Sequence, residues 1–139
     1  MYLYTYISLF NAEGLPIKIN VDGIPLEIKQ DDSIRKELCY WRKANAIHRY
    51  FVDNCAGGED NCEEMFVSKD RLKELLGICE KVLNNKNKAK DLLPSGSGFF
   101  FGSLEYDDYY FDNVDRTAKC LKEILNNPLI NYVYYQASW

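Results

Sequence analysis

The sequence predicts a single-domain α+β protein, in which an N-terminal antiparallel β-meander and two C-terminal strands pack against three helices. Three observations support this class. Apolar residues alternate with polar ones in the first thirty positions, recur at helical spacing in later segments, and form aromatic runs near residues 100 and 134. The chain has 139 residues, 47% of them hydrophobic and 27% charged. Residues 1–139 are therefore expected to form one domain with a buried core.

The N-terminal strands are predicted from the period-two alternation. Apolar and polar residues alternate over 17–21 and again over 24–28, and the Asp-Gly pair between them is typical of a two-residue hairpin turn. A second turn signal at 11–14 adds a preceding strand over 2–10, which gives a three-stranded meander. Because Pro25 has no amide hydrogen, the third strand is expected at a sheet edge.

The period then changes to 3.6 residues, which predicts a long first helix. Asp32 or Ser33 can cap it, and apolar positions recur on one face from Ile34 to Val52 before the helix ends ahead of Gly57. On this interpretation the segment from residue 33 to residue 56 is one continuous amphipathic helix.

The second half of the chain contains the remaining predicted elements. Residues 65–67 are a short strand or the entry to the next element, a second helix capped by Ser68. A Gly/Ser-rich loop precedes a buried strand that is predicted at 99–101. The third helix has its apolar positions over 114–125. The aromatic segment 132–135, continuing to residue 139, is predicted as the final strand.

Charge and cysteine content limit the partners and the compartment. The chain has 17 basic and 21 acidic residues, a net charge of −4, so direct nucleic-acid binding is not expected. No run approaches the roughly 20 apolar residues of a spanning helix, so no membrane partner is expected. The five cysteines are odd in number and lack paired spacing, and Met1 is not followed by a signal-peptide pattern. Reduced thiols in a cytosolic setting, without cofactor or metal, are the expectation.

Three arginines define one candidate site. Arg35, Arg42 and Arg49 are seven residues apart, so on one helix they would form a basic row with Asn45 beside it. Arginine forks bind phosphate or carboxylate oxygens, which makes a ligand-facing row one interpretation. The alternative is a solvated helix face paired with the chain's own acids.

A tyrosine- and acid-rich stretch defines a second candidate site. Five acids are interleaved here with three tyrosines: Glu105, Asp107, Asp108, Asp112 and Asp115 with Tyr106, Tyr109 and Tyr110. Such a stretch suits an interaction surface or a nucleic-acid mimic. The alternative is a turn whose tyrosines pack on the sheet while its acids cap the next helix.

His48 is the only histidine, so any histidine-dependent chemistry involves it. It lies seven residues from both Trp41 and Cys55, so a Cys55–His48 thiolate pair is conceivable on one helix face. A hydrogen-bonded core histidine is the simpler interpretation. The spacing of the histidine and cysteines does not match a zinc motif.

Three stretches resemble a family of small uncharacterised proteins of bacteriophages and prophage-bearing bacteria. They are the segment Tyr40-Trp-Arg-Lys-Ala-Asn-Ala-Ile-His-Arg-Tyr-Phe-Val-Asp-Asn54, the segment Ser97-Gly-Phe-Phe-Phe-Gly-Ser103 running into Tyr106 and Tyr110, and the terminal Tyr134-Tyr-Gln-Ala-Ser-Trp139. The resemblance implies a phage or mobile-element origin, and small phage proteins without enzymatic motifs often act by binding. The resemblance also implies a shared surface. Its expected residues are Trp41, Arg42, Asn45 and His48 of the helix, with Phe101, Tyr106, Asp107 and Tyr110 of the loop.

Aromatic residues make up 14% of the chain and fall into two predicted populations. Tyr2, Tyr4 and the runs 99–101 and 132–135 have strand spacing and are assigned to core packing. Trp41, Tyr106, Tyr109 and Tyr110 lie among charged residues and are assigned to binding. The whole predicted binding surface comprises Trp41, Arg42, Asn45, His48, Arg49, Phe101, Tyr106, Asp107, Tyr109 and Tyr110.

The leading functional hypothesis is a non-enzymatic phage-type binding protein, a counter-defence inhibitor that binds a host immune protein or sequesters its nucleotide signal. Arg42 and Arg49 would take the phosphates of a nucleotide, whose base would stack on an aromatic ring. One alternative is a small nucleotide- or phosphoester-processing enzyme with His48 and Asp107 as acid and base. Another is a self-assembling phage accessory protein that uses the aromatics over 132–139 as an oligomer edge.

Overall fold

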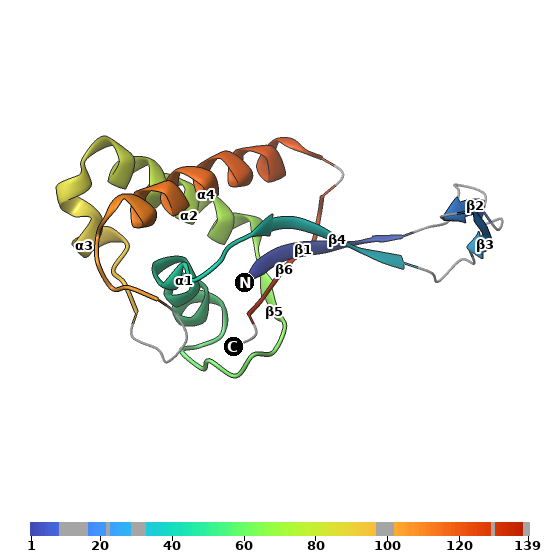
Figure 1. Cartoon of the computed structure of the whole chain (residues 1–139), viewed down its shortest axis with the longest axis horizontal. Coiled ribbons are helices and arrows are strands. Elements are labelled where there is room, and N and C mark those ends of the chain that lie inside the picture. The colour runs from blue at the N-terminus through green and yellow to red at the C-terminus, as the bar shows by residue number, and fades with distance from the viewer. Residues whose placement is uncertain (9–16, 22, 29–32, 97–101, 129, 138–139) are drawn as a thin grey trace.

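The computed structural model describes residues 1–8, 17–21, 23–28, 33–96, 102–128 and 130–137. The strands are β1 (Tyr2–Ser8), β2 (Ile17–Val21), β3 (Ile24–Ile28), β4 (Ser33–Tyr40), β5 (Met65–Val67) and β6 (Val133–Gln136). The helices are α1 (Asn45–Cys55), α2 (Lys69–Asn84), the 3₁₀ turn η1 (Lys86–Lys88), α3 (Ala89–Leu92) and α4 (Asp108–Asn126). The α+β class is therefore confirmed (Figure 1).

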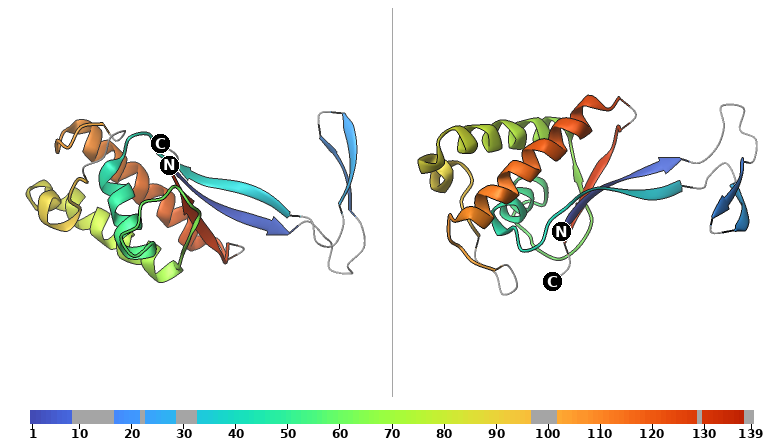
Figure 2. Two further views of the ribbon diagram at one scale, coloured as in Figure 1. Left: turned by 90° about the horizontal axis from the view of Figure 1, so that it is seen from below. Right: turned by 45° about the horizontal axis from the view of Figure 1, so that its top comes forward.

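The main sheet has four antiparallel strands in the order β4-β1-β6-β5. Strand β1 is central, because it pairs with β4 on one side and with β6 on the other. Strands from the two ends of the sequence are thus hydrogen-bonded neighbours. The helices gather on one side of this sheet (Figures 1 and 2).

The predicted three-stranded meander is wrong in its pairing, although its strands exist. Strand β1 pairs with β4, while β2 and β3 pair only with each other as a two-stranded sheet. Val21 faces Ile24 across a two-residue connection, and Gly23 has φ of +80°, so the predicted hairpin is confirmed. Alternation identifies a strand but does not identify its partner, which explains the error.

The predicted long helix is wrong in its first half. Residues Ser33–Tyr40 form strand β4, and α1 begins only at Asn45. The ladder of β4 with β1 shifts register between Leu3 and Tyr4, so one strand carries an extra residue opposite the other. Such a bulge breaks strict alternation, and the apolar positions then mimic a helical period.

The later helices and strands follow the prediction more closely. The Ser68 side chain accepts a hydrogen bond from the Arg71 amide at 3.2 Å and caps α2, as expected. Strand β5 confirms the strand interpretation of 65–67, and β6 occupies the first part of the strand predicted from 132 to 139. Helix α4 begins at Asp108, so the tyrosine- and acid-rich stretch supplies the N-cap residue Asp107 and the first two turns of this helix. The predicted strand at 99–101 lies outside the described residues.

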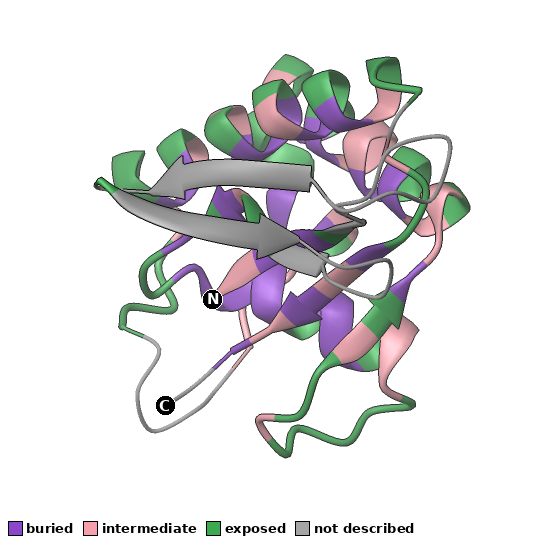
Figure 3. Ribbon diagram, turned by 90° about the vertical axis from the view of Figure 1, so that its right-hand side faces the viewer, coloured by how far each residue is buried: buried purple, intermediate pink, exposed green. Residues whose placement is uncertain are grey.

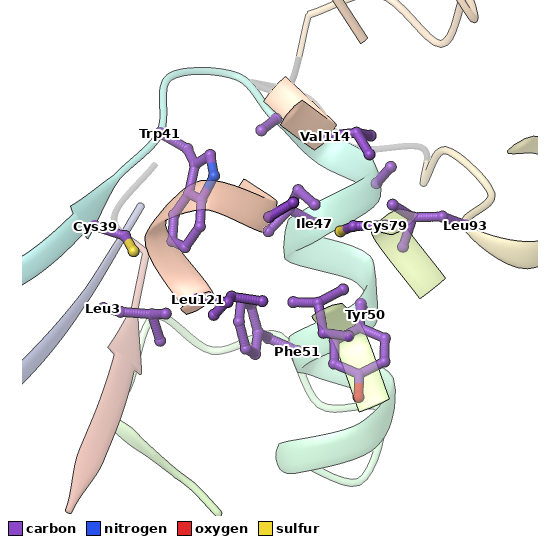
Figure 4. Packing of buried hydrophobic residues seen from close by; sticks show 14 of the residues in the cluster. Leu3, Cys39, Trp41, Ile47, Tyr50, Phe51, Cys79, Leu93, Val114 and Leu121 are labelled. Carbon is purple, nitrogen blue, oxygen red and sulfur yellow. The ribbon is translucent and has the colours of Figure 1, made fainter. Parts of the chain in front are cut away.

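The core lies between the sheet and helices α1, α2 and α4 (Figure 4). Leu3, Phe51 and Leu121 come from a strand and two helices, and all three are fully buried there. Burying such side chains stabilises the fold by about 1.5–3 kcal/mol each.

A disulfide joins Cys39 of β4 to Cys120 of α4 and ties the sheet to a helix. This corrects the expectation that all five cysteines are reduced; Cys55, Cys62 and Cys79 are free thiols. The two bonded cysteines are 81 residues apart, so no local spacing could reveal the pair. In the described ranges, no helix has the length and apolar character needed to cross a membrane.

Candidate binding surfaces

The helix and the tyrosine-rich loop that the sequence selected do lie against each other. The Asn45 side-chain amide donates to the Ser103 carbonyl oxygen at 2.7 Å, and the Tyr109 hydroxyl donates to the Arg42 carbonyl oxygen. The two motifs, more than fifty residues apart in sequence, therefore form one continuous piece of structure.

Two of the aromatic residues predicted for binding, Trp41 and Tyr110, are buried in the core. Trp41 is only 2% exposed, and its indole nitrogen donates to Thr117 Oγ1 at 2.7 Å. Tyr110 is also buried and donates to the Leu93 carbonyl oxygen at 2.7 Å, and burial raises the pKa of its hydroxyl. The half-buried Tyr106 accepts from the Ser95 amide at 3.1 Å. Trp41 and Tyr110 thus belong to the core, because their polar atoms find partners inside the protein.

The remaining predicted residues have mixed positions. Asp107 is the N-cap of α4, where its carboxylate accepts from the Tyr110 amide at 3.0 Å. Tyr109 and Arg42 have exposed side chains, whereas Asn45 is buried. Phe101 lies outside the described residues.

The basic row does not form. Arg35 lies on β4, Arg42 in the connection after it, and only Arg49 on a helix. Arg49 donates to the Ser95 carbonyl oxygen at 2.9 Å and faces Asp53 at 3.4 Å. Because the predicted helix is half strand, the seven-residue spacing no longer places the arginines on one face.

His48 is buried and is hydrogen-bonded through both ring nitrogens. Its Nδ1 lies 2.6 Å from the Tyr135 hydroxyl, and its Nε2 lies 2.9 Å from Asp60 Oδ2. Burial, followed by the nearby Asp60 charge, raises the pKa of Tyr135 well above its ordinary value. The predicted His48–Asp107 pair is therefore not formed, because Asp60 holds the histidine and Asp107 caps α4.

The Cys55–His48 thiolate pair is not supported, because the ring nitrogens of His48 contact Tyr135 and Asp60. Burial raises the pKa of the Cys55 thiol to about 11, which keeps it protonated at neutral pH. No group of three or more potential metal ligands occurs within the described part of the chain.

A pocket of about 310 Å³ opens beside α1. Its lining consists of Asn45, His48, Arg49, Val52, Asp53, Asp60 and Gly96. This lining contains one arginine, Arg49, and two carboxylates, Asp53 and Asp60, and Arg49 already contacts Asp53. The local charge therefore disfavours a phosphate group.

The outer face of the main sheet, turned away from the helices, carries the largest group of aromatic side chains. We define the aromatic face as Tyr2, Tyr4, Tyr6, Tyr40, Phe66, Tyr132 and Tyr134. The pairs Tyr2↔Tyr40, Tyr4↔Tyr134 and Phe66↔Tyr134 are in register, so their side chains share this side. Figure 3 shows buried and more exposed positions along these strands.

The rings of the aromatic face contact one another. Tyr134 stacks on Tyr4 with ring centroids 5.8 Å apart and meets Tyr6 and Phe66 edge-on at 5.5 and 5.9 Å. Tyr4 is fully covered by this packing, but Tyr6, Phe66 and Tyr132 are 46%, 52% and 64% exposed. Tyr40, at the other edge of the sheet, is 53% exposed, so four rings of this packed aromatic layer are open to a partner.

The assignment of the strand aromatics to the core is confirmed for Tyr4 and Tyr135, which are fully buried, and wrong for Tyr132, which is 64% exposed. Tyr135 is buried among the helices, but its neighbours Tyr132 and Tyr134 point the other way. The sequence contains a signal for this outer surface, because tyrosines occupy both odd and even positions of one predicted strand and so point to opposite faces of the sheet. Period-two geometry cannot bury both.

Glu64 links the aromatic face to a second pocket. Its Oε2 accepts hydrogen bonds from the hydroxyls of Tyr4 and Tyr6, the latter at 2.9 Å. The bond to Glu64 raises the pKa of Tyr6. Glu64 also lines a pocket of about 270 Å³ together with Cys55, Ala56, Glu59, Asn61, Glu63 and Met65. We call this the acidic pocket.

Comparison of the chain with protein-family models, with curated proteins and with solved structures found no match. The functional proposals that follow therefore depend on the chain's own geometry and chemistry.

Proposed function

We propose that this chain is a non-enzymatic binding protein that docks a partner protein through the aromatic face. One observation carries the proposal: Tyr6, Phe66 and Tyr132 are about half exposed on the outer side of the sheet. The solvent side of an antiparallel sheet is ordinarily polar, so a continuous aromatic layer there needs an explanation.

The chemistry of the aromatic face suits a protein interface. Tyrosine and phenylalanine rings supply large contact areas and lose little side-chain entropy when they are covered. Tyr6 is further fixed by its hydrogen bond to Glu64 and its edge contact with Tyr134. A partner would therefore meet a surface that is already ordered, which lowers the entropic cost of association.

The alternative functions have weaker geometric support. A nucleotide messenger needs cationic groups for its phosphates, but Arg42 and Arg49 do not lie on one helix and Arg49 contacts Asp53. An acid–base enzyme needs an accessible histidine, but His48 is buried between Tyr135 and Asp60. Both considerations favour binding to a protein over binding or processing a nucleotide.

The resemblance to phage proteins suggests the kind of partner. On that basis we propose a host defence protein in the bacterial cytoplasm as the target and inhibition as the result of docking. The phage origin and the counter-defence role depend on the resemblance, whereas the docking surface depends on the geometry of the sheet.

Site-specific photo-crosslinking tests the docking surface directly. Benzoylphenylalanine would replace Phe66 in one variant and Leu104 in a second, because Leu104 is 50% exposed but lies in the loop before α4. After irradiation in bacterial cells, a discrete adduct with another protein is expected from position 66 and none from position 104. Purified partner should then bind the unmodified chain and lose at least tenfold in affinity to a Phe66→Ala/Tyr132→Ala variant.

Two outcomes would contradict the proposal. Equal adducts from both positions would mean indiscriminate contact, and no adduct from position 66 would mean that the aromatic face has no partner in these cells. An adduct of two copies, near twice 16.2 kDa, would instead indicate self-association through this face.

A further inference from the structure

We infer that the aromatic face and the acidic pocket together recognise an arginine-bearing segment of the partner protein. This inference depends on the proposed docking function and adds the chemistry of the occupant. The guanidinium would enter the acidic pocket, while neighbouring apolar side chains of the segment would lie across Phe66 and Tyr6.

The first argument is that the aromatic face already binds a guanidinium of its own. The Arg35 Cζ lies 3.6 Å from the centroid of the Tyr4 ring and 4.6 Å from that of Tyr2. Arg35 Nη2 also donates to Gln136 Oε1 at 3.0 Å. Ring faces and polar side chains on this surface are thus spaced to hold a planar cation.

The second argument is the charge of the acidic pocket. Three carboxylates line it, from Glu59, Glu63 and Glu64, and its lining includes no basic residue among those that the structure describes. Its volume of about 270 Å³ leaves room for a guanidinium and part of its aliphatic stem. A cation from a partner would therefore enter a site of complementary charge.

The third argument is that Glu64 connects the two surfaces. Both tyrosine hydroxyls donate to Oε2 of Glu64, so among the described residues its Oε1 is the oxygen left to accept from a partner. Phe66 follows two residues later, on β5, which begins directly after Glu64, and it extends the aromatic face. A single extended segment can therefore place one cation at Glu64 and its neighbouring side chain on Phe66.

Arginine fits this arrangement better than lysine. A guanidinium can donate two parallel hydrogen bonds to one carboxylate and stack on an aromatic ring at the same time, whereas an ammonium group is a strongly hydrated point charge. A nucleic-acid strand would also stack on the rings, but its phosphates would meet the three glutamates. The observations favour a basic protein segment.

Fluorescence anisotropy with two labelled peptides tests the inference. One peptide has the sequence Arg-Leu-Arg-Leu-Arg and the other replaces each arginine by lysine, so that net charge is matched. The arginine peptide is expected to bind at least threefold more tightly. A Glu59→Gln/Glu63→Gln variant should weaken its binding at least tenfold, and Phe66→Ala at least threefold.

The control variant is Glu105→Gln/Glu123→Gln, which removes the same charge at exposed positions outside the acidic pocket. Its affinity should stay within twofold of the unmodified chain. Equal binding of the two peptides, or equal losses in the two double variants, would reduce the effect to general charge attraction and overturn the inference. An unchanged affinity in Phe66→Ala would remove the aromatic face from the site and overturn it as well.

The same variants separate this inference from the proposed function. If the photo-adduct from position 66 persists undiminished in Glu59→Gln/Glu63→Gln, the aromatic face docks a protein without the acidic pocket and the arginine inference is wrong. If arginine-selective peptide binding is found but no adduct forms, the recognition chemistry is correct and the proposed docking in cells is wrong.

Discussion

The two faces of the main sheet use the same residue type for different purposes. On the inner face Tyr135 is fully buried, stacks on Phe51 with ring centroids 4.3 Å apart, and meets His48 through its hydroxyl. On the outer face the adjacent Tyr134 stacks on Tyr4 at 5.8 Å, within a layer whose outermost rings are half exposed. Strand parity, and not residue type, decides which tyrosine stabilises the fold and which can meet a partner.

Replacing one phenylalanine on each side would test this difference most strongly. Phe51→Ala would leave a cavity against Tyr135 and should lower the free energy of unfolding by about 3–5 kcal/mol. Phe66→Ala removes a half-exposed ring and should cost less than about 1 kcal/mol. Urea denaturation followed by circular dichroism measures both. Similar losses in the two variants would mean that the faces are not energetically distinct.

Reduction of the Cys39–Cys120 disulfide should have the next largest effect. The bond closes a loop of about 80 residues between the inner face of β4 and α4, so its loss should cost about 2–4 kcal/mol. The urea midpoint with and without a phosphine reductant measures this change. A Cys39→Ala/Cys120→Ala variant should be insensitive to the reductant. A mass spectrum with five free thiols in the unreduced protein would show that the bond does not form.

Alkaline pH should weaken the fold through its buried tyrosines. Burial raises the pKa of Tyr50, Tyr110 and Tyr135 above the ordinary value of about 10. Above that pH the unfolded chain loses these protons while the folded chain keeps them, so stability is complete below about pH 10 and falls as the pH rises. Each such tyrosine contributes a slope of about −1.4 kcal/mol per pH unit.

Tyr50→Phe provides the matched variant for this pH dependence. Urea midpoints between about pH 9 and about pH 11 should fall less steeply in Tyr50→Phe than in the unmodified chain, because one titrating group is missing. Equal slopes would mean that Tyr50 ionises alike in both states.

The smallest effect is expected at Asp107, which the sequence selected as a binding residue. Because its carboxylate caps α4, Asp107→Ala should lower stability by about 1 kcal/mol. Asp107→Asn keeps an acceptor and should restore most of that loss. Thermal unfolding measures both variants, and full stability of Asp107→Ala would argue against a capping role.

Local patterns predicted the elements that depend on local physics. The cap at Ser68, the hairpin turn at Gly23 and the short strand at 65–67 were all found, because caps and turns require particular residues at particular positions. The helix over 33–56 failed where a bulge between Leu3 and Tyr4 shifted the strand register. That register belongs to two segments more than thirty residues apart, so no window on either segment contains it.

The sequence by itself determined that this is one α+β domain with an unusually high content of tyrosine. Local spacing also selected His48 as a residue held in the core and the acids near 107 as helix caps, each as one of two interpretations. Only the tertiary structure decided that β1 lies between β4 and β6, which places Tyr6, Phe66 and Tyr132 on one face beside Glu64. The reason is physical: periodicity fixes which side of a strand a residue takes, but the pairing of distant strands fixes what lies beside it.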